Sequence, residues 1–433
     1  MKGTKLYETW HNTNARFNGY FNAKEKMLED EDKLFENHVD DYNKILDVFT
    51  ITTDKDVKSY TADMDLILKK CAKVITKHSS SKWVKNCYFV IGKANFYKRD
   101  FYAAIETFEY VAEKYPESPV GQESRVWLVR CYMENSKMNE AQTMLANDNA
   151  DKKFPILFKP DLSIVEADYA IRTNDYKTAI TKLEYAIPLL KVRKYRTRYM
   201  FILAQLYELV GENKKSADYY QMVIKRSPTY EMSFQARLKL AGVSVNSAEV
   251  EKYLFKLLKD DRNIAFYDQI YYTLAKLELK QNHRDKALEY LKMSTKVSKK
   301  NDNQKALSFL LEAETYFKVP AYPQSKMYYD SAAKFITKDY PNYDAFKARQ
   351  SILSELIGDL ITLQLQDSLL KISKLDTATI NKMIDDIIEA NRQKSIAQSQ
   401  NKNNNNNNPR SNTYPKHPGQ QREWRRRQGK LFL

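Results

Sequence analysis

The sequence predicts an all-α protein built from repeated pairs of helices, with strand content near zero. Three observations predict this fold class. Only 9 of the 433 residues are glycine and 12 are proline, so long stretches can be helical without interruption. Apolar residues recur at i, i+3 and i+4 along most of the chain, which is the spacing of one helix face. A pattern of small, large and proline positions returns about every 37 residues, as expected of stacked units.

The clearest unit is 83-WVKNCYFVIGKANFYKRDFYAAIETFEYVAEKYP-116. With Gly92 at position 8 of a helix–turn–helix unit, Ala104 falls at position 20, Phe108 at position 24 and Pro116 at position 32. Small residues at positions 8 and 20 let two antiparallel helices approach closely. The large residue fills the space beneath them, and proline ends the second helix. These are the positions of a tetratricopeptide repeat, and we predict a superhelix of such repeats.

The same template fits about seven units over residues 79–343. The fifth unit fits least well, because Leu238 and Val250 stand where small residues belong. Small residues at position 20 should be buried where the two helices of a unit touch. Position 8 is Gly92, Val129, Ala167, Ala204, Leu238, Ala275 and Ala313; position 20 is Ala104, Ala141, Ala179, Ser216, Val250, Ala287 and Ser325; position 24 is Phe108, Leu145, Leu183, Tyr220, Leu254, Leu291 and Tyr329.

Further segments are expected on both sides of the array. Residues 1–78 should contain an N-terminal segment and a helical hairpin, with helices over Asp32–Val48 and Val57–Lys77. Residues 344–393 should form two capping helices that cover the last exposed core of the array. Residues 394–433 contain an asparagine run and three prolines, so we expect a disordered, Asn-rich basic tail.

The net charge of +16 is unevenly distributed. Residues 392–433 contain ten Lys/Arg and one acid, a net charge of +9, and the rest of the chain is close to balanced. A nucleic-acid-binding body would place its excess on the folded surface, so we predict no specific nucleic-acid partner. Cys71, Cys87 and Cys131 have no paired spacing, which argues against a disulfide framework or a zinc site and favours buried thiols.

No pattern of catalytic, cofactor-binding or metal-ligating residues is found in the sequence. The chain lacks phosphate-binding glycine loops, GxSxG and HExxH motifs and calcium-binding loops. The adjacent carboxylates Asp40–Asp41, Asp260–Asp261 and Asp385–Asp386 would diverge by about 100° on a helix, so we expect that they cannot oppose each other as acid and base. No stretch of 18 apolar residues occurs. We therefore predict a non-enzyme with no catalytic residue, no cofactor, no metal and no membrane span.

A superhelix of paired helices offers a concave groove lined by the first helix of each pair. Aromatic side chains interleaved with cationic ones suit an extended peptide or a partner helix. The alternative is that these are ordinary half-exposed helix residues, and the Lys/Asn pattern of repeats that clamp a C-terminal carboxylate is not reproduced. The predicted partner-binding residues are Asn86, Phe89, Lys93, Phe96, Arg130, Arg198, Phe201, Tyr272 and Lys276.

Several segments together resemble a known family. They are 10-WHNTNARFNGYFNAKEKM-27 with 41-DYNKILDVF-49, the first repeat, and 367-DSLLKISKLDTATINKMIDDIIEANRQK-394 with the asparagine run after it. Over roughly residues 8–408 the chain resembles the first half of the SprE/PorW-type lipoproteins of the type IX secretion and gliding-motility apparatus. The resemblance implies a scaffold on the periplasmic face of the outer membrane that links the translocon to ring and motor components.

Two features depart from that family. Its members carry a lipidated cysteine after a signal peptide, and nothing before Lys5 can serve, so we expect membrane attachment only through an anchor missing from this chain. Its members also continue into a second helical half, so we expect a partial chain. Two alternatives stay open: a cytosolic adaptor for a client peptide or nucleic acid, and an envelope enzyme with a repeat domain. In the adaptor the basic tail would supply electrostatic affinity; for the scaffold we expect the groove, rather than the tail, to bind the partner.

Overall fold

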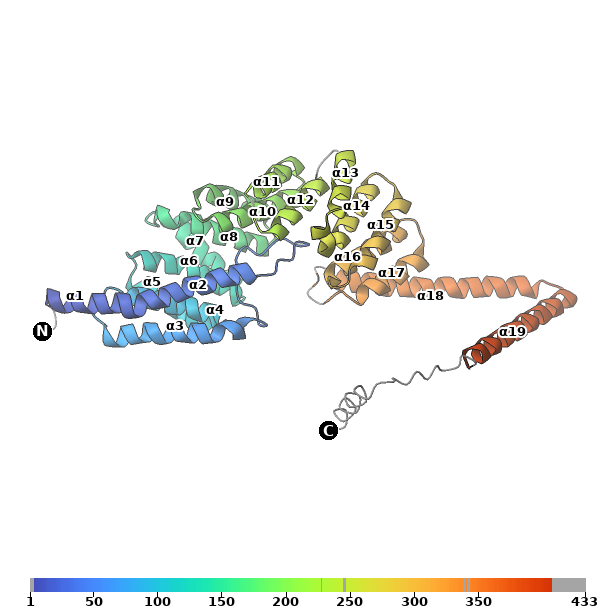
Figure 1. The fold of residues 1–433 in the computed structure, drawn as a ribbon, viewed down its shortest axis with the longest axis horizontal. Helices are drawn as coiled ribbons and strands as arrows, with labels where there is room; N and C mark the ends of the chain where they lie inside the picture. Colours follow the sequence, from blue (N-terminus) through green and yellow to red (C-terminus); the bar gives the residue numbers. More distant parts are fainter. Residues whose placement is uncertain (1–3, 227, 244–246, 338–339, 341–342, 407–433) are drawn as a thin grey trace, which may run out of the picture. The chain divides into compact units, whose positions relative to one another are not determined.

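The computed structural model consists of helices and their connections (Figure 1), and it describes residues 4–226, 228–243, 247–337, 340 and 343–406. No strand occurs in this described part, and the predicted all-α class is confirmed. None of its helices combines the length and apolar character that crossing a membrane requires. The chain divides into two compact units, residues 1–312 and 313–433, and each is described by itself.

Seven successive helix pairs follow the predicted repeat register. The last pair spans the point where the first unit ends and the second begins. The pairs are α4 (Val84–Tyr97) with α5 (Phe101–Lys114), α6 (Pro119–Glu134) with α7 (Met138–Ala150), α8 (Lys159–Arg172) with α9 (Tyr176–Ala186), α10 (Arg193–Leu209) with α11 (Asn213–Lys225), α12 (Tyr230–Val243) with α13 (Ser247–Leu258), α14 (Tyr267–Lys280) with α15 (Arg284–Val297), and α16 (Asp302–Phe317) with α17 (Tyr322–Ala333). Short turns η2 (Ile156–Phe158), η3 (Ile187–Leu189) and η4 (Asp261–Phe266) precede α8, α10 and α14.

Close packing between the two helices of each pair confirms this register. Every residue at position 20 is at most 7% exposed, including Val250. A Cβ atom on Gly92 would lie 2.7 Å from the Phe108 ring, so the first pair needs glycine at position 8. Where position 20 is serine, its hydroxyl donates to the carbonyl of position 8, as Ser216 does to Ala204 at 2.9 Å. The small residues therefore set the distance between paired helices.

The turn inside a pair has the same geometry wherever the structure describes it; the turn of the fifth pair lies outside the described residues. The residue seven positions after position 8 has a left-handed backbone, and the next amide donates to a carbonyl five residues back, as Asp100 N does to Asn95 O at 3.0 Å. This pattern satisfies the last carbonyls of the first helix. The Asp100 carboxylate then accepts from Ala103 N at 3.2 Å and caps the second helix. The left-handed residues are Arg99, Ser136, Asn174, Gly211 and Asn282.

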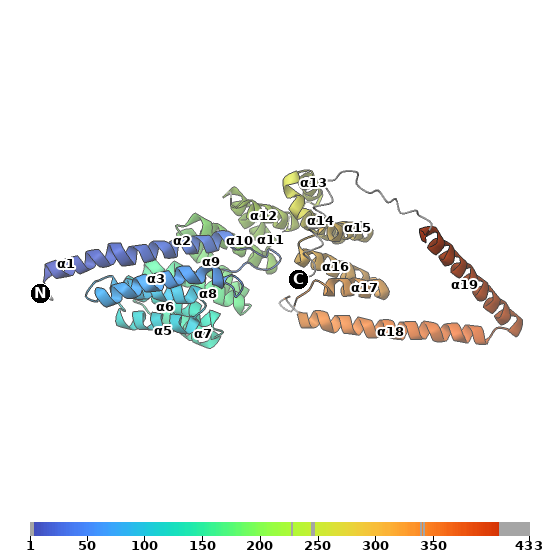
Figure 2. The same cartoon turned by 60° about the horizontal axis from the view of Figure 1, so that its bottom comes forward.

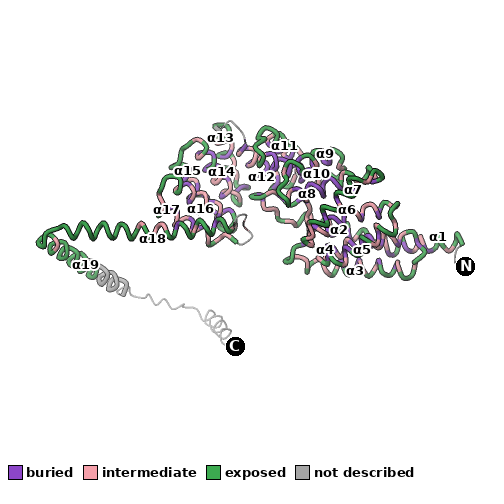
Figure 3. Tube along the Cα trace, turned by 180° about the vertical axis from the view of Figure 1, so that it is seen from behind, coloured by how far each residue is buried: buried purple, intermediate pink, exposed green. Residues whose placement is uncertain are grey.

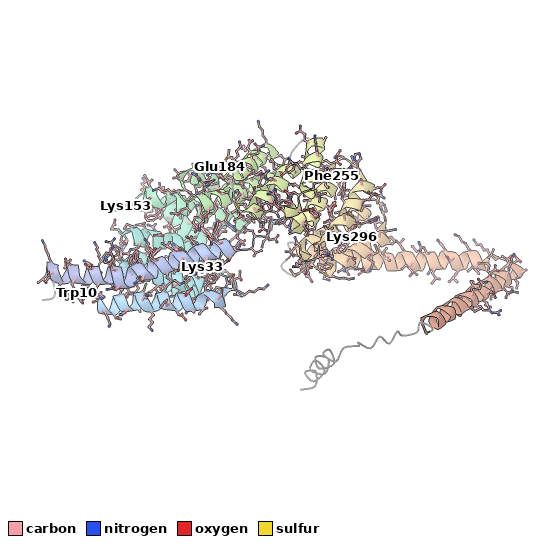
Figure 4. The ribbon with its side chains drawn as sticks, viewed as in Figure 1. Trp10, Lys33, Lys153, Glu184, Phe255 and Lys296 are labelled. Carbon is pink, nitrogen blue, oxygen red and sulfur yellow. The ribbon has the colours of Figure 1, made fainter. Side chains whose placement is uncertain are left out.

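The N-terminal helix is longer than the sequence predicted. α1 (Lys5–Asn14), the π-helical turn η1 (Ala15–Tyr20) and α2 (Phe21–Asn37) form a continuous rod beside α3 (Val57–Lys77) (Figures 1 and 2). A Cβ atom on Gly19 would lie 2.1 Å from Val74 Cγ2, so glycine permits this close approach. The side chain of Trp10, labelled in Figure 4, is partly exposed, and its ring centroid lies 5.5 Å from that of His78 at the end of α3.

The predicted helix over Asp32–Val48 is wrong beyond Asn37. Residues 38–56, which we call the strap, form no helix. The apolar spacing of the strap suggested a helix, but Tyr42, Leu46 and Val48 are buried against α8 to α12 instead. Side chains of α10 satisfy part of the strap backbone, so the strap does not need the hydrogen bonds of its own helix.

The C-terminal helices of the second unit are α18 (Tyr343–Ser373) and α19 (Thr377–Asn406). Phe346 and Leu353 of α18 are buried, but side chains such as Ile361, Ile387 and Ile388 are about 60% exposed. Figure 3 shows the later part of α18 and the start of α19 as exposed. The prediction that both helices cap the array is therefore wrong for α19, whose described side chains cover no core.

The predicted tail boundary also changes, because α19 continues through Asn406. Once a helix is nucleated, each further residue adds one hydrogen bond, so the helix can extend past residue 394 without a core. The rest of the predicted tail, residues 407–433, lies outside the described residues. The three cysteines are free and buried, as predicted.

Candidate partner-binding site

The strap lies on the face of the first unit that is formed by the first helices of the pairs. From α10, the Arg198 guanidinium donates to both carboxylate oxygens of Asp40 at 2.8 Å. It also donates to the carbonyl oxygen of Asp47, at 2.8 and 3.0 Å. Two turns further, Gln205 Nε2 donates to Lys44 O at 2.7 Å, and Leu46 N donates to Gln205 Oε1 at 3.0 Å. This inner face therefore binds a non-helical backbone, which turns at residues 41–44, and a carboxylate.

Apolar contacts fasten the same segment. Tyr42, Leu46 and Val48 are each at most 7% exposed. The Tyr42 ring meets the Phe201 ring edge-on, with centroids 5.3 Å apart. Burial of three large side chains stabilises the strap by several kcal/mol, at about 1.5–3 kcal/mol for each fully buried side chain. The strap is thus an integral part of the first unit.

The end of the strap is anchored near the first pair. Thr52 Oγ1 donates to Tyr97 O at 2.6 Å, and the Arg99 guanidinium donates to Thr52 O at 3.0 Å. Between this anchor and the contacts at Arg198, Phe49 lies over the guanidinium of Arg130, 4.0 Å from its carbon. The strap therefore covers part of the inner face and borders the part that stays open.

The open part is a cavity of about 460 Å³, which we call the inner cavity. It is lined by α2, α4, α6, α8, α10, the turns η2 and η3, and the strap. Its apolar rim includes Leu157, Leu189 and Val192, which are 69%, 52% and 49% exposed. Its walls are largely aromatic, with polar groups placed among the rings: Phe35, Phe49, Tyr97, Trp127, Tyr195 and Tyr199, with Glu31, Glu123, Arg130 and Asp161.

Arg130 and Arg198 are both buried cations that line the inner cavity, and they differ in their partners. The Arg130 side chain is 9% exposed, and its guanidinium carbon lies 3.9 Å from the Trp127 ring centroid and 5.1 Å from that of Phe96. Together with Phe49 these rings hold the guanidinium plane by cation–π contacts. Among the residues that the structure describes, no carboxylate or carbonyl accepts a hydrogen bond from Arg130.

The carboxylates around the cavity differ in their partners. Glu31 pairs with Lys93 at 2.7 Å and accepts from the Tyr97 hydroxyl at 2.8 Å. Burial raises the pKa of Glu123, and Lys93 only partly offsets this effect. Asp161 keeps accessible surface inside the cavity, but the surrounding walls desolvate its carboxylate and raise its pKa, which the Arg130 charge lowers in part. Neither Glu123 nor Asp161 forms an ion pair within the described part of the chain.

Asp40 of the strap shows the opposite balance. Burial would raise the pKa of this carboxyl, but hydrogen bonds from His38 and Arg198 hold it below its ordinary value. A carboxylate on this face therefore stays charged when an arginine donates to it, whereas Glu123 and Asp161 lack such a donor.

Several predicted binding residues are buried by the chain itself, and the prediction is corrected for them. Phe96 and Phe201 are at most 1% exposed, Phe89 is 7% exposed and Arg198 is 2% exposed. Phe89 packs on Phe108, with ring centroids 5.6 Å apart. They offer no surface to a partner, because the aromatic side chains fill the helix interfaces and the strap covers α10.

The other predicted residues lie in three places. Arg130 lines the inner cavity, and the half-buried Lys93 pairs with Glu31, which also lines it. Asn86 is half-buried beside Tyr20 of the N-terminal rod. Tyr272 and Lys276 line a separate cavity of about 90 Å³ between α12 and α14.

The sequence analysis missed Glu123, Trp127, Asp161 and Tyr199 as cavity residues. A usable signal was present, because Glu123 and Asp161 are acids in first helices that are otherwise largely apolar. The strap itself had no usable signal in the repeat template, since it precedes the array by many residues. Its contacts with α10 join positions 158 residues apart.

Comparisons with known proteins bear on the fold alone. No family model matches the chain, and no curated protein matches it. Solved structures similar to it include a tetratricopeptide repeat protein from Parabacteroides merdae ATCC 43184, with 11% identity, 62% of this chain and 98% of that chain covered, and a TM-score of 0.44. The apo form of RapI shows 12% identity, coverage of 67% and 86%, and a TM-score of 0.45. The apo quorum sensor NprR from B. thuringiensis shows 11% identity, coverage of 62% and 80%, and a TM-score of 0.42.

The fold of this chain is a tetratricopeptide-repeat fold. At these identities and TM-scores the solved structures carry nothing further, and the assignment follows from the seven helix pairs and their buried small residues. In the described ranges, no group of three or more His, Cys, Asp or Glu side chains is placed to hold a metal ion.

Proposed function

We propose that this protein is a non-catalytic scaffold of tetratricopeptide-repeat type that binds an extended segment of a partner protein on the inner face of its first unit. The observation that carries the proposal is the binding of the strap by Arg198 and Gln205 through carbonyl, amide and carboxylate groups. These are the groups of any extended peptide, so the face already uses the chemistry that a partner segment requires.

The finer proposal is that the scaffold serves the type IX secretion and gliding-motility machinery, where it links the outer-membrane translocon to periplasmic ring and motor components. The resemblance of residues 8–408 supports it. In the segment that is most specific to that resemblance, Asn12 accepts from Ser81 Oγ at 3.0 Å and from Lys82 N at 2.9 Å, and His11 Nδ1 lies 2.9 Å from His78 Nδ1. These residues therefore attach the N-terminal rod to the start of the array.

The proposed location, by the same resemblance, is the periplasmic face of the outer membrane, with attachment through a lipid anchor. The proposed partners are other proteins of the machine. The rival is a cytosolic adaptor that binds a client peptide or nucleic acid, and the two functions predict different partners in the same experiment.

The test is affinity capture of the tagged full-length protein after cross-linking in cells, followed by mass spectrometry of the envelope and soluble fractions. We expect translocon, ring and motor proteins to be enriched from the envelope. Deletion of residues 394–433 should leave this capture nearly unchanged in moderate salt, because screening weakens contacts made by exposed charges. Recovery of soluble clients or RNA, lost on deleting the tail, would favour the adaptor.

A further inference from the structure

We infer that the inner cavity binds a partner peptide that contains adjacent basic and acidic residues. The acidic side chain of the peptide contacts Arg130, and its basic side chain contacts Glu123 and Asp161. This inference rests on the proposed function, and it specifies the chemistry that the scaffold selects. The argument has three parts: the state of Arg130, the state of the two carboxylates, and the shape of the cavity.

Arg130 is nine-tenths buried and lines the cavity, and no acceptor is available to it among the described residues. A buried charge without a partner is costly to the fold, so its presence needs a reason. Stacking between Trp127 and Phe49 fixes the guanidinium plane, at 3.9 and 4.0 Å from the two centroids. An arginine held in this way needs little further ordering to donate two parallel hydrogen bonds to a carboxylate.

Arg198 provides the comparison within the same molecule. It lies on the same face and is buried to a similar extent, and there the strap supplies a carboxylate to both terminal nitrogens at 2.8 Å. The strap gives Arg130 only the ring of Phe49. The position that Asp40 fills at Arg198 thus has no counterpart at Arg130, and a bound peptide can fill it.

Glu123 and Asp161 require a second charge on the ligand. Both line the cavity, and neither pairs with a cation in the described part of the chain. A peptide that brought only a carboxylate would be repelled by them, and one that brought only a cation would leave Arg130 without an acceptor. A ligand with both charges satisfies all three groups, and adjacent basic and acidic residues are the simplest such ligand.

The cavity and its rim suit a short segment of extended chain. Its volume of about 460 Å³ lies within the range of about 300–1,000 Å³ that is common for ligand sites. The exposed Leu157, Leu189 and Val192 on the rim offer apolar area to the residues that flank the charged pair. Aromatic walls such as Tyr195 and Tyr199 can cover the methylene stem of a basic side chain.

The test uses four blocked tetrapeptides that differ only in charge: Leu-Lys-Glu-Leu, Leu-Lys-Gln-Leu, Leu-Gln-Glu-Leu and Leu-Gln-Gln-Leu. Their dissociation constants for the full-length protein are measured by isothermal titration calorimetry. We expect Leu-Lys-Glu-Leu to bind at least about tenfold more tightly than Leu-Gln-Gln-Leu, since a hydrogen-bonded charge contributes about that much. The singly charged peptides should bind weakly.

Two variants assign the charges. Arg130→Gln should remove the preference for Glu over Gln in the peptide and keep the preference for Lys. Asp161→Asn should remove the preference for Lys over Gln and keep the preference for Glu. This change leaves the core intact, because Asp161 lies in the accessible first turn of α8. Glu140→Gln, on the exposed surface of α7, is the matched control and should change neither preference.

Equal affinity for all four peptides, or no measurable binding of any, would overturn the inference. A preference for one charge only, or preferences that survive both substitutions, would also overturn it. None of these results bears on the scaffold proposal, which is decided by the capture of machine components and not by these peptides. If Arg130→Gln fails to fold, as judged by circular dichroism, the Asp161→Asn arm still decides the role of the basic side chain.

Discussion

Two arginines on the same inner face differ in whether the chain supplies a hydrogen-bond acceptor for them. This difference distinguishes a structural contact from a candidate binding site. Arg198 donates four hydrogen bonds to the strap and is 2% exposed. Arg130 is almost equally buried, but aromatic rings surround it and no acceptor meets it in the described residues. A paired buried charge stabilises the local fold, and an unpaired one is kept at a cost in stability. The pairing of each arginine therefore predicts what its removal does.

The largest expected effect comes from Arg198→Met. This change leaves Asp40 with a side chain only 10% exposed and without its bidentate donor. Breaking a buried pair costs about 3–5 kcal/mol, and we expect that loss in the free energy of unfolding of the first unit. The matched Arg130→Met change should not lower it, because no pair is broken and an unpaired buried charge is removed. Urea denaturation of both variants measures these changes. Equal losses in the free energy of unfolding would contradict the distinction between the two arginines.

Glu312 extends the comparison to a buried acid. It is fully buried, neither carboxylate oxygen accepts a hydrogen bond from any residue that the structure describes, and burial raises its pKa to about 8. The unfolded chain therefore ionises first as pH rises above about 4.5, and the folded state loses stability up to about pH 8. Glu312→Gln should remove this loss and stabilise the protein by about 2 kcal/mol at pH 7.

Glu278→Gln is the control of opposite sign. Burial alone would raise the pKa of Glu278, but Lys286 and His283 hold it below its ordinary value. Its carboxylate stabilises the fold above the unfolded pKa, so the substitution should destabilise the protein at pH 7. Thermal melts of both variants at pH 5 and pH 7 test whether the two substitutions change stability in opposite directions. A Glu312→Gln variant that is no more stable at pH 7 would contradict the prediction.

Mild acid should weaken ligand binding in the inner cavity before it weakens the contacts of the strap. The raised pKa values of Glu123 and Asp161 mean that these carboxyls take up protons before ordinary acids as pH falls. Affinity for a basic peptide side chain should therefore begin to weaken at a higher pH than ordinary Asp and Glu groups would give. The pKa of Asp40 is lowered, so its contribution is lost only when pH falls below the ordinary Asp range. Hydrogen exchange of the Leu46 amide should stay slow at pH 5, and loss of the strap there would contradict this order.

The smallest effect is expected in the turns. Ser136 has a left-handed backbone, with φ of 59°, and its side chain is exposed. Ser136→Gly should stabilise the protein by about 0.5–1 kcal/mol, because glycine adopts this conformation without strain. Arg99, with φ of 63°, donates to Thr52 O and pairs with Asp54 at 2.8 Å. Arg99→Gly should therefore gain nothing in a melting experiment, since the end of the strap loses its anchor.

Periodicity predicted the part of the fold that local contacts determine. Positions such as Gly92, Ala104 and Phe108 contact one another within a single pair, so their spacing shows in the sequence. The fixed turn residue was also readable, since Asn174, Gly211 and Asn282 tolerate a left-handed backbone. The left-handed position was not recognisable at Arg99 and Ser136, because arginine and serine do not favour a left-handed backbone.

The candidate site could not be predicted in the same way, because its decisive contacts are distant in the sequence. Arg130 was identified from its place on a first helix, but the burial of Phe201 and Arg198 depends on a segment near the N-terminus. The apolar residues of that segment have helical spacing, but the segment is not helical, because α10 supplies hydrogen-bond partners for its backbone. Likewise, the apolar stripe on α19 suggested a capping helix, but an apolar stripe alone does not determine which surface the helix packs against.

The strap has a consequence for how the chain folds. In a simple repeat array each pair touches only its neighbours, and pairs can form or fray one by one. Here the contacts between Asp40 and Arg198 span 158 residues, so the N-terminal rod and the first four pairs are joined into one cooperative block. On a ribosome, residues 38–56 are made long before α10, and Tyr42, Leu46 and Val48 have no place to bury until the fourth pair emerges. We expect the pairs after α11 to open first under stress, and the strap to be among the last native contacts to form.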